Sequence, residues 1–236
     1  MPSKKNESNA QTLLNAEKPK TQDAGKQSVA LDAPGVAKAV AKRIAEDIDE
    51  YNIRAYDGGH RWHLGASLIG EECKRKLWYI FRWCYHETAP TPKDHGRKLR
   101  LFNRGHREEA RFIEWLKGIG AQVWTHETPD VYNEQGEIVI EGKQFRVSAV
   151  MGHFGGSLDG IARLPERYGI DEPVLLEFKT SGTGQGFNKS VEDGMPVAKP
   201  QHFAQTSTYG SDPAYNFRYC LYFIINKNDD SLHVEL

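Results

Sequence analysis

Residues 155–180 read GGSLDGIARLPERYGIDEPVLLEFKT, and the fold expected for the chain depends on this stretch. Two short apolar runs are separated by Pro, Gly and charged residues, which predicts two β-strands joined by a loop. Alternate side chains of a strand share a face, so Glu177 and Lys179 point together while Leu176 and Phe178 point the other way, into apolar packing. If the two strands are neighbours, Asp159 at the end of the first apolar run lies beside Glu177.

The charges inside VLLEFK suggest a cation site. Two carboxylates held together repel each other, and an isolated buried charge is costly. A hard divalent cation such as Mg²⁺ between Asp159 and Glu177 removes the conflict, because it prefers carboxylate oxygens together with water and phosphate. Lys179 would then lie close to a metal-bound water or a phosphate. A surface Glu–Lys pair on an edge strand, with Asp159 in a simple turn, explains the same residues without a function.

Outside this stretch, the period of the apolar residues changes near residue 120. Before that point, apolar residues at helical spacing predict helices over 36–53, 68–84 and 97–117. After it, short runs predict strands, with one helix over 201–209 that begins after a proline. The strand-like runs are AQVWTHE, EIVIEG, FRVSAVM, FGGSLDGIARL, VLLEFKT, YCLYFIIN and LHVEL. Helices followed by a sheet predict an α/β domain with a central mixed sheet.

The expected domain organisation follows from where large apolar residues occur. Residues 1–32 hold few of them and are rich in Lys, Asn, Gln, Ser and Ala, so we expect a disordered polar tail. Residues 33–236 then form one domain. It is mainly helical over 33–120, and the sheet core with one inserted helix follows over 121–236.

The amino-acid composition limits the classes of function that the chain can have. The chain has 236 residues, of which 39% are hydrophobic, and its net charge is −1, so any nucleic-acid contact needs a local basic face. Its three cysteines (Cys73, Cys84 and Cys220) form no CxxC pair, which argues against a zinc site or a disulfide framework. No apolar run is long enough for a membrane span, and the start lacks the apolar core of a signal peptide. We therefore expect a cytoplasmic protein that does not bind membranes.

The predicted helix over 68–84 carries a possible binding face. Ser67 precedes it in the position of a helix cap, and an apolar stripe is expected to face the core. That stripe consists of Ile69, Cys73, Leu77, Ile80 and Cys84. On the opposite face Arg75, Tyr79 and Arg82 recur at i, i+4 and i+7, a pattern that suits phosphate contacts and stacking on a frayed DNA end. A solvated helix face explains the pattern equally well.

Two further helical patterns carry potentially functional side chains. In FNRGHREEARFIEWLKGIG, His106 and Glu109 lie on or beside the stripe that carries Ile113 and Leu116 toward the core. A core histidine bonded to a backbone carbonyl is the bland interpretation, and a metal ligand is the functional one. In KPQHFAQTSTYG, Gln201, Gln205 and Tyr209 recur every four residues, so they share one face of the predicted helix. This face is either a solvated polar surface or a set of side chains that position a water and a phosphate backbone.

The order of these features resembles the PD-(D/E)XK nuclease superfamily, in its RecB-like and λ-exonuclease-like branch. A helix with His and Glu, a strand ending in Asp, a strand with ExK and a helix with QxxxY follow one another over about residues 64–225. The resemblance implies a restriction-endonuclease-like fold, in which helices flank a central mixed sheet after an N-terminal helical part. It also implies a metal-dependent exonuclease that hydrolyses linear DNA in recombination, repair or phage DNA metabolism.

The resemblance assigns roles to several residues of this chain. Asp159 and Glu177 would bind Mg²⁺ or Mn²⁺, Lys179 matches the catalytic lysine of the family, and Gln205 matches the glutamine of its helix. The helical metal ligand is a histidine in some members and a glutamate in others, so both His106 and Glu109 qualify. HLGASLIG is similar to a family segment whose serine, together with one just before the metal aspartate, holds a DNA 5′-phosphate. The matching residues are Ser67, which is equally suited to capping a helix, and Ser157, with Arg61 nearby as a possible arginine.

The resemblance also bears on cofactors and partners. Relatives with an iron–sulfur cluster use one early and three late cysteines, and only Cys220 is late here, so we expect no cluster. The expected partners are linear DNA with an end, a single-strand annealing or recombination protein, and further copies of the chain in a homo-oligomer. Alternatives are a structure-specific endonuclease or resolvase with the same site, a catalytically silent DNA-binding module, and an unrelated α/β protein with an accidental ExK.

Overall fold

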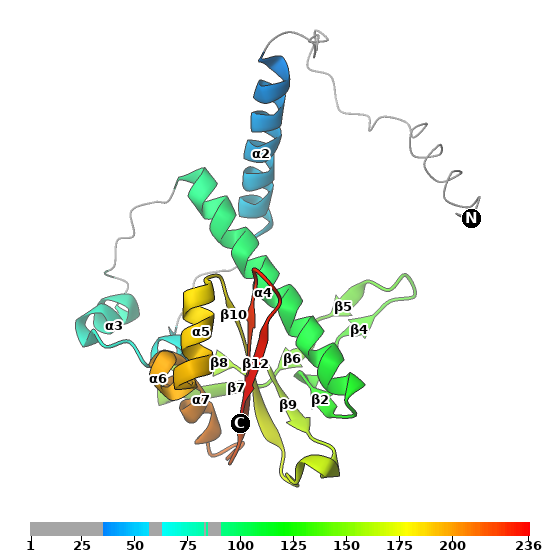
Figure 1. Ribbon diagram of the computed structural model, residues 1–236, viewed down its shortest axis with the longest axis vertical. Coiled ribbons are helices and arrows are strands. Elements are labelled where there is room, and N and C mark those ends of the chain that lie inside the picture. Colours follow the sequence, from blue (N-terminus) through cyan, green and yellow to red (C-terminus); the bar gives the residue numbers. More distant parts are fainter. Residues whose placement is uncertain (1–34, 57–62, 83, 85–90) are drawn as a thin grey trace. The chain divides into compact units, whose positions relative to one another are not determined.

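The computed structural model describes residues 35–56, 63–82, 84 and 91–236 (Figure 1). The chain divides into two units, 1–45 and 46–236. Of the first unit, the described part is the beginning of helix α2 (Val36–Ala55). The predicted polar tail and Arg61 lie outside the described residues.

A five-stranded mixed sheet forms the centre of the second unit, with strand order β12-β11-β10-β9-β2. Its strands are β2 (Gln122–Trp124), β9 (Gly160–Arg163), β10 (Val174–Ser181), β11 (Cys220–Asn226) and β12 (Leu232–Glu235). β10 and β11 run parallel and every other pair is antiparallel. The prediction of an α/β protein with a mixed sheet is therefore confirmed.

The predicted strand FGGSLDGIARL is wrong as a single element, because the chain changes sheets within it. Its first part is β8 (Phe154–Ser157), which lies between β1 (Leu64–Gly65) and β7 (Arg146–Ala149) in a separate three-stranded sheet. Its second part is β9 of the central sheet. Leu158 at the junction is buried against Leu175 and Tyr209. Burying Leu158 turns the chain between the two ladders and leaves Asp159 at the corner.

Two small ribbons complete the strands. β3 (His126–Thr128) pairs with β6 (Lys143–Gln144), and β4 (Val131–Tyr132) pairs with β5 (Ile138–Ile140). The predicted run AQVWTHE is wrong as a single strand, because it is divided between β2 of the central sheet and β3. The predicted run EIVIEG contains a shorter strand, β5. The apolar residues of the β4–β5 ribbon are exposed.

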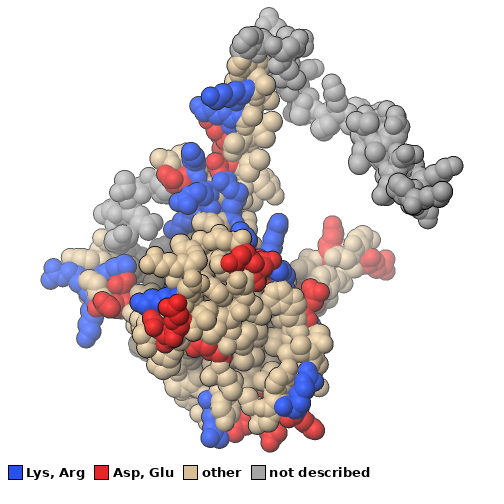
Figure 2. Space-filling view, in the orientation of Figure 1, with Lys and Arg blue, Asp and Glu red and all other residues tan. Residues whose placement is uncertain are grey.

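Helix α4 (Pro92–Gly118) covers one face of the central sheet. Its first residue, Pro92, is five residues earlier than the predicted start at 97. The N-cap is Thr91, whose side chain accepts a hydrogen bond from the Asp94 backbone N–H at 3.2 Å. The buried ring of Phe112 stacks on Phe178 with centroids 5.0 Å apart. Basic side chains gather around the N-terminal half of this helix (Figure 2).

The opposite face of the sheet is covered by three helical segments rather than the single predicted helix. These are α5 (Gly184–Asp193), α6 (Met195–Ala198) and α7 (Pro200–Gly210), which lie next to one another (Figure 1). The helix predicted over 201–209 is confirmed as α7. α5 was not predicted, because its glycine-rich start reads as a loop, but Thr183 caps it by accepting from the Gly186 backbone N–H at 3.1 Å. Phe187 of α5 packs on Tyr222 and Ile224.

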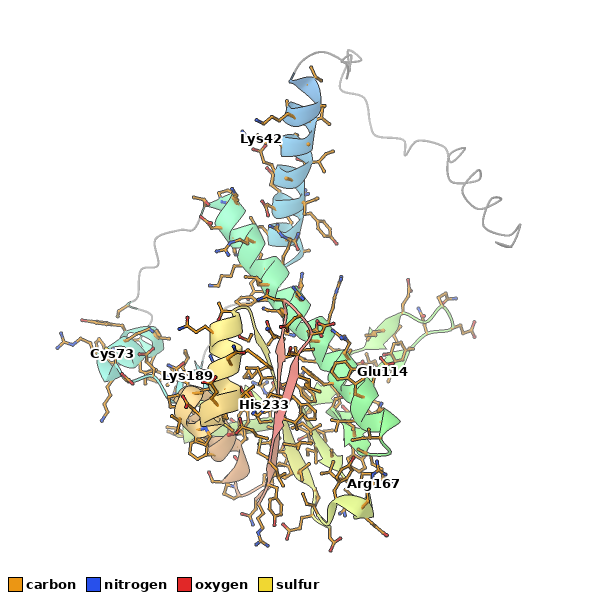
Figure 3. All side chains as sticks on the ribbon, in the orientation of Figure 1. Lys42, Cys73, Glu114, Arg167, Lys189 and His233 are labelled. Carbon is orange, nitrogen blue, oxygen red and sulfur yellow. The ribbon has the colours of Figure 1, made fainter. Side chains whose placement is uncertain are left out.

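The region around Ser67 differs most from its prediction. Ser67 lies inside a 3₁₀ turn (Ala66–Leu68) and caps no helix, since α3 (Lys74–Phe81) begins after Cys73 (Figure 3). Within the described part of this region the expected core stripe is wrong, because α3 contains no buried residue. Just before α3 the chain packs closely against α7, since a Cβ at Gly70 would collide with Gln201.

The helix predicted over 36–53 is confirmed as α2, and its apolar residues Val40, Ile44 and Ile48 are exposed. Asp49 of the same helix is instead buried and pairs with Arg100 of α4. Among the described helices, none combines the length and the apolar character needed to cross a membrane.

Candidate active site

The two charges of β10 lie on the same face of the sheet, as the sequence predicts. Leu176 and Phe178 belong to the apolar cluster under α4, whereas Glu177 points toward the helices of the other face. Glu177 is fully buried, and the ammonium of Lys179 donates a hydrogen bond to its Oε1. The second oxygen, Oε2, is buried and has no hydrogen-bond partner among the described residues.

Asp159 lies against the same strand. β9 pairs antiparallel with β10, with Gly160 opposite Leu176, so that Asp159 extends the register toward Glu177. Its Oδ2 accepts a hydrogen bond from the Phe178 backbone N–H at 2.6 Å. The adjacency of the two strands is thus confirmed, and the backbone of β10 holds the Asp159 carboxylate in place.

The electrostatics of this group are dominated by burial. Loss of water raises the pKa of Glu177 to about 7, against the opposing effect of Lys179. Burial likewise raises the pKa of Asp159. Burial alone would lower the pKa of Lys179, but the Glu177 and Asp159 carboxylates outweigh it and raise that pKa. Lys179 therefore stays protonated, and its charge is the main local compensation for two crowded carboxylates.

His106 and Glu109 of α4 approach this group from the side. The His106 Nδ1 lies 3.2 Å from Glu109 Oε1, and the His106 side chain is 74% exposed. Burial, followed by repulsion from Asp159, raises the pKa of Glu109. Glu109 is the more buried of the two predicted helical ligands, and His106 lies at the rim as its hydrogen-bond partner.

A cleft of about 660 Å³ opens over these residues. Seven of the predicted site residues line it: Ser67, His106, Glu109, Ser157, Asp159, Gln205 and Tyr209. They come from the 3₁₀ turn, α4, β8, the β8–β9 junction and α7, so the fold gathers residues spread over most of the second unit. Glu177 and Lys179 are not among the lining residues, although their neighbour Asp159 is, and Lys179 keeps 25% of its side chain exposed.

The structure adds lining residues that the sequence did not point to. Arg146 of β7 is the one Lys or Arg among the described residues of the lining, and it pairs in register with Ser157 of β8. His63 and His126 line the cleft as well. A lone arginine in FRVSAVM carries no distinguishing pattern, and only the β7–β8 pairing brings it beside a predicted phosphate-binding serine.

The three polar residues predicted to share one face of α7 do not all reach the cleft. The buried Gln205 donates from Nε2 to the Tyr209 hydroxyl at 3.3 Å, and burial raises the pKa of Tyr209 to about 12. A Cβ at Gly156 would collide with that hydroxyl, so the glycine allows the phenol to approach β8. Gln201 does not join them, because it lies against Gly70, outside the cleft lining.

The other predicted DNA contacts are also separate from the cleft. Arg75, Tyr79 and Arg82 are exposed on or next to α3 and do not line it. Tyr79 packs edge-on against Trp78, with ring centroids 5.2 Å apart. α3 therefore presents a basic and aromatic surface of its own.

The residues fit a hard divalent cation. Within the described ranges no three His, Cys, Asp or Glu side chains already surround one point as ligands would. Lys179, the Phe178 N–H and His106 each contact one carboxylate oxygen of the site. The unpaired Glu177 Oε2 is nevertheless an acceptor buried without a donor, next to the Asp159 carboxylate. An oxygen-rich, charge-crowded site of this kind suits Mg²⁺ or Mn²⁺.

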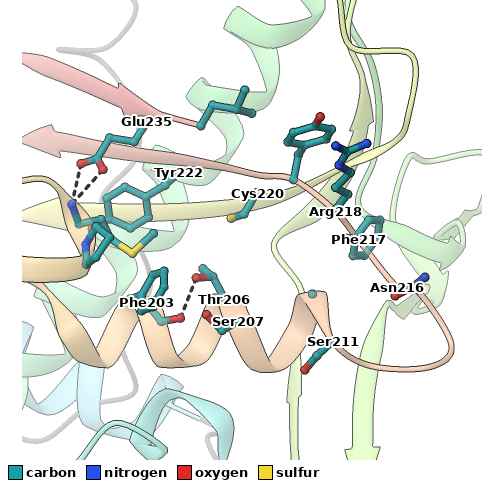
Figure 4. A pocket seen from close by; sticks show the side chains of 15 residues that line it. Phe203, Thr206, Ser207, Ser211, Asn216, Phe217, Arg218, Cys220, Tyr222 and Glu235 are labelled. Atoms are coloured by element: carbon teal, nitrogen blue, oxygen red, sulfur yellow. Dashed lines mark hydrogen bonds between the residues drawn. The ribbon is translucent and has the colours of Figure 1, made fainter.

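A second cavity, of about 570 Å³, has a different character (Figure 4). It lies between α6, α7 and β11, and apolar side chains such as Phe203 and Phe217 line much of it. Its carboxylate, Glu235, accepts from the Met195 backbone N–H at 2.9 Å and so holds the start of α6. Burial raises the pKa of the Cys220 thiol, which disfavours a reactive thiolate there. This cavity lacks the crowded acids of the cleft.

No protein-family model matches this chain, and no curated protein is significantly similar to it. The chemistry of the cleft is therefore argued from its own residues.

Proposed function

We propose that the protein is a Mg²⁺- or Mn²⁺-dependent deoxyribonuclease of the PD-(D/E)XK type, with a restriction-endonuclease-like fold. The observation that carries the proposal is the buried Glu177 Oε2 without a partner, next to Asp159 and Lys179 on adjacent strands. A fold that needed only stability would place apolar side chains at these positions. Glu177 is fully buried, whereas Asp159 and Lys179 are partly exposed. The cost of burying the Glu177 carboxylate beside a second acid is explained by a cation and a phosphate that join the three groups.

Asp159 and Glu177 would hold the cation, with Glu109 as the ligand from α4. Glu109 fits this role better than His106, because its carboxylate is the more buried and is electrostatically coupled to Asp159. When bound, the cation would supply a Lewis acid that polarises a phosphodiester and acidifies an attacking water.

The chain's own residues prepare the site for this chemistry. The Phe178 N–H fixes the orientation of Asp159, and Lys179 favours the ionised form of Glu177. Lys179 remains protonated and partly exposed, so its ammonium can orient a water and offset charge on a phosphate. The Gln205–Tyr209 pair forms the facing wall and can donate hydrogen bonds into the cleft.

Arg146, Ser157 and Ser67 support an exonuclease that grips a DNA end. All three line the cleft, and the register of β7 and β8 places Arg146 opposite Ser157. A guanidinium opposite one hydroxyl, with a second hydroxyl in the same cleft lining, is suited to a terminal phosphate. Linear DNA in the cytoplasm is the proposed substrate. An annealing or recombination partner and a homo-oligomer belong to the same proposal.

Digestion of end-defined DNA tests the proposal. Linear duplexes carrying a 5′-phosphate, a 5′-hydroxyl or blocked 3′ ends, and a closed circle, are incubated with Mg²⁺ or with chelator. We expect degradation of linear DNA with Mg²⁺ alone, fastest with the 5′-phosphate, and a loss of about 10²–10⁴-fold in Lys179→Ala. Lys189→Ala, at an exposed position on α5, is the control and should retain wild-type activity.

Each other outcome has a defined meaning. Equal degradation of the closed circle would replace the exonuclease by an endonuclease with the same site. Wild-type activity in Lys179→Ala, or no Mg²⁺-dependent hydrolysis of any substrate by a folded wild-type protein, would overturn the nuclease proposal.

A further inference from the structure

One face of α4 is basic along most of its length. Within this helix the positions that recur at alternating intervals of four and three residues share a face. Every such position from 93 to 111 is a lysine or arginine. This basic stripe consists of Lys93, Arg97, Arg100, Arg104, Arg107 and Arg111. At 1.5 Å per residue it extends about 27 Å along the helix.

Folding alone does not explain the basic stripe. Like charges three or four residues apart destabilise a helix, and surface helices normally mix the two signs. Arg100 pairs with Asp49, and Arg111 pairs with Glu108 and Asp230. Arg104 donates to the Lys227 carbonyl. For Lys93, Arg97 and Arg107, no ion-pair partner lies within the described part of the chain, although the whole chain has a net charge of only −1.

The basic stripe does not belong to the candidate active site. At 100° per residue, His106 and Glu109 lie about 140–160° around α4 from the centre of the stripe. None of the six stripe residues lines the cleft. The space-filling view shows basic side chains gathered on the outer surface around the N-terminal half of α4 (Figure 2).

We propose that the basic stripe of α4 is a second nucleic-acid-binding surface, which holds the phosphate backbone of duplex DNA outside the catalytic cleft. Five of its six side chains are arginines, whose planar donors match phosphate oxygens better than an ammonium does. A straight row about 27 Å long matches about eight base pairs of duplex, at 3.4 Å per pair along one strand. The contacts are to phosphates, so the surface binds DNA of any sequence.

This surface goes beyond the proposed hydrolysis and does not depend on it. A DNA held on the outer side of α4 keeps the protein on its substrate while the cleft acts on an end. The same contacts would form with DNA that has no end. Binding at the stripe and reaction in the cleft can therefore be measured separately.

Binding of a labelled 30-base-pair duplex whose two ends are closed by hairpins tests the inference. Fluorescence anisotropy is recorded in chelator over about 50–200 mM KCl, so that neither cleavage nor end recognition contributes. The test variant is Arg97→Gln/Arg107→Gln, because neither residue makes a contact on which the described fold depends. The matched control, Lys117→Gln/Lys189→Gln, removes the same charge from exposed positions outside the stripe. Circular dichroism and thermal unfolding verify that both variants fold.

We expect the test variant to bind about tenfold more weakly than the control at the lowest salt. The slope of log affinity against log salt should decrease by about 2, one unit for each lost phosphate contact. Cleavage of the linear duplex at saturating concentration should keep its wild-type rate constant, because the cleft is intact.

Equal affinity and equal salt slope in test variant and control would overturn the inference. It would also be overturned if the test variant lost binding to poly-glutamate but not to DNA, since the stripe would then serve an acidic protein segment. A wild-type protein that binds the closed duplex through the stripe but hydrolyses nothing would refute only the nuclease proposal.

Discussion

The two faces of β10 differ in what they contribute to the protein. On one face Phe178 stacks on Phe112 and contacts Phe223, with ring centroids 5.0 and 5.5 Å from Phe178. On the other face its neighbour Glu177 is equally buried, but has one unpaired oxygen. The aromatic face therefore stabilises the fold, whereas the charged face lowers its stability by leaving a buried carboxylate oxygen without a donor. Four predictions test this division, from the largest expected effect to the smallest.

Removing the aromatic contact on the stabilising face should have the largest effect. Phe112→Ala deletes a fully buried ring, so the free energy of unfolding should fall by about 3–5 kcal/mol. Urea unfolding followed by circular dichroism measures the change. Trp124→Ala, at an exposed aromatic residue, should change it much less. Similar losses in the two variants would contradict the assignment of the core to this face.

Adding a divalent cation should stabilise the charged face. At a fixed concentration of one hundred times the Kd measured at pH 8, Mg²⁺ or Mn²⁺ should raise the free energy of unfolding at pH 8 by about 2.7 kcal/mol. The gain should be larger at pH 8 than at pH 5, because protons compete for Glu177 and Asp159, whose pKa values burial raises. Thermal unfolding with and without chelator measures it. A gain of the same size in Asp159→Asn/Glu177→Gln would show that the cation binds elsewhere.

Replacing the buried acid should stabilise the cation-free protein at high pH. Burial raises the pKa of Glu177 from 4.5 to about 7, so its protonated form is favoured in the fold. Its contribution to stability is complete below about pH 4.5 and is lost as the pH rises through 7. Glu177→Gln cannot ionise, and should be more stable than wild type at pH 8, by at most about 3 kcal/mol, with no gain near pH 4.5. Chemical unfolding in chelator at both pH values decides the point, and a gain independent of pH would contradict it.

A substitution of Tyr209, which lines the cleft together with Asp159, should change the free energy of unfolding least. Tyr209→Phe removes the hydroxyl that accepts from Gln205 at 3.3 Å, which should lower the free energy of unfolding by about 1 kcal/mol. The rate of DNA hydrolysis should fall more than this small loss of stability implies. Steady-state kinetics measures the rate. Ser207→Ala, at an exposed position on the same helix, is the control and should leave both quantities unchanged.

The predictions made from sequence were right where local pattern and fold agree, and wrong where packing overrides pattern. The alternation in VLLEFK was sufficient to separate the Glu177 and Phe178 faces, because a strand has a period of two whatever covers it. The stripe through Ile69, Cys73 and Leu77 satisfied helical spacing equally well. It is nevertheless not buried, because burial depends on whether another apolar surface packs against the helix, and Gly70 contacts α7 before α3 begins.

The candidate site shows the same limit. Asp159, Glu177 and Lys179 could be named in advance, because two carboxylates beside a lysine in apolar surroundings are chemically unusual in any fold. Arg146 could not be named, since an arginine that begins a short strand has no local signature. It became a candidate through the pairing of β7 with β8.

By itself the sequence determined the strand that carries the charges, most of helix α4, and the order of the chemical groups along the chain. These depend on spacings of two to four residues, which the backbone geometry of strands and helices imposes locally. The tertiary structure decided that the chain turns between sheets at Leu158, that α7 faces Asp159 across a cleft, and that the basic stripe of α4 lies away from it. Those relations join residues distant in sequence, and they follow from which apolar surfaces pack together, a choice that no single segment encodes.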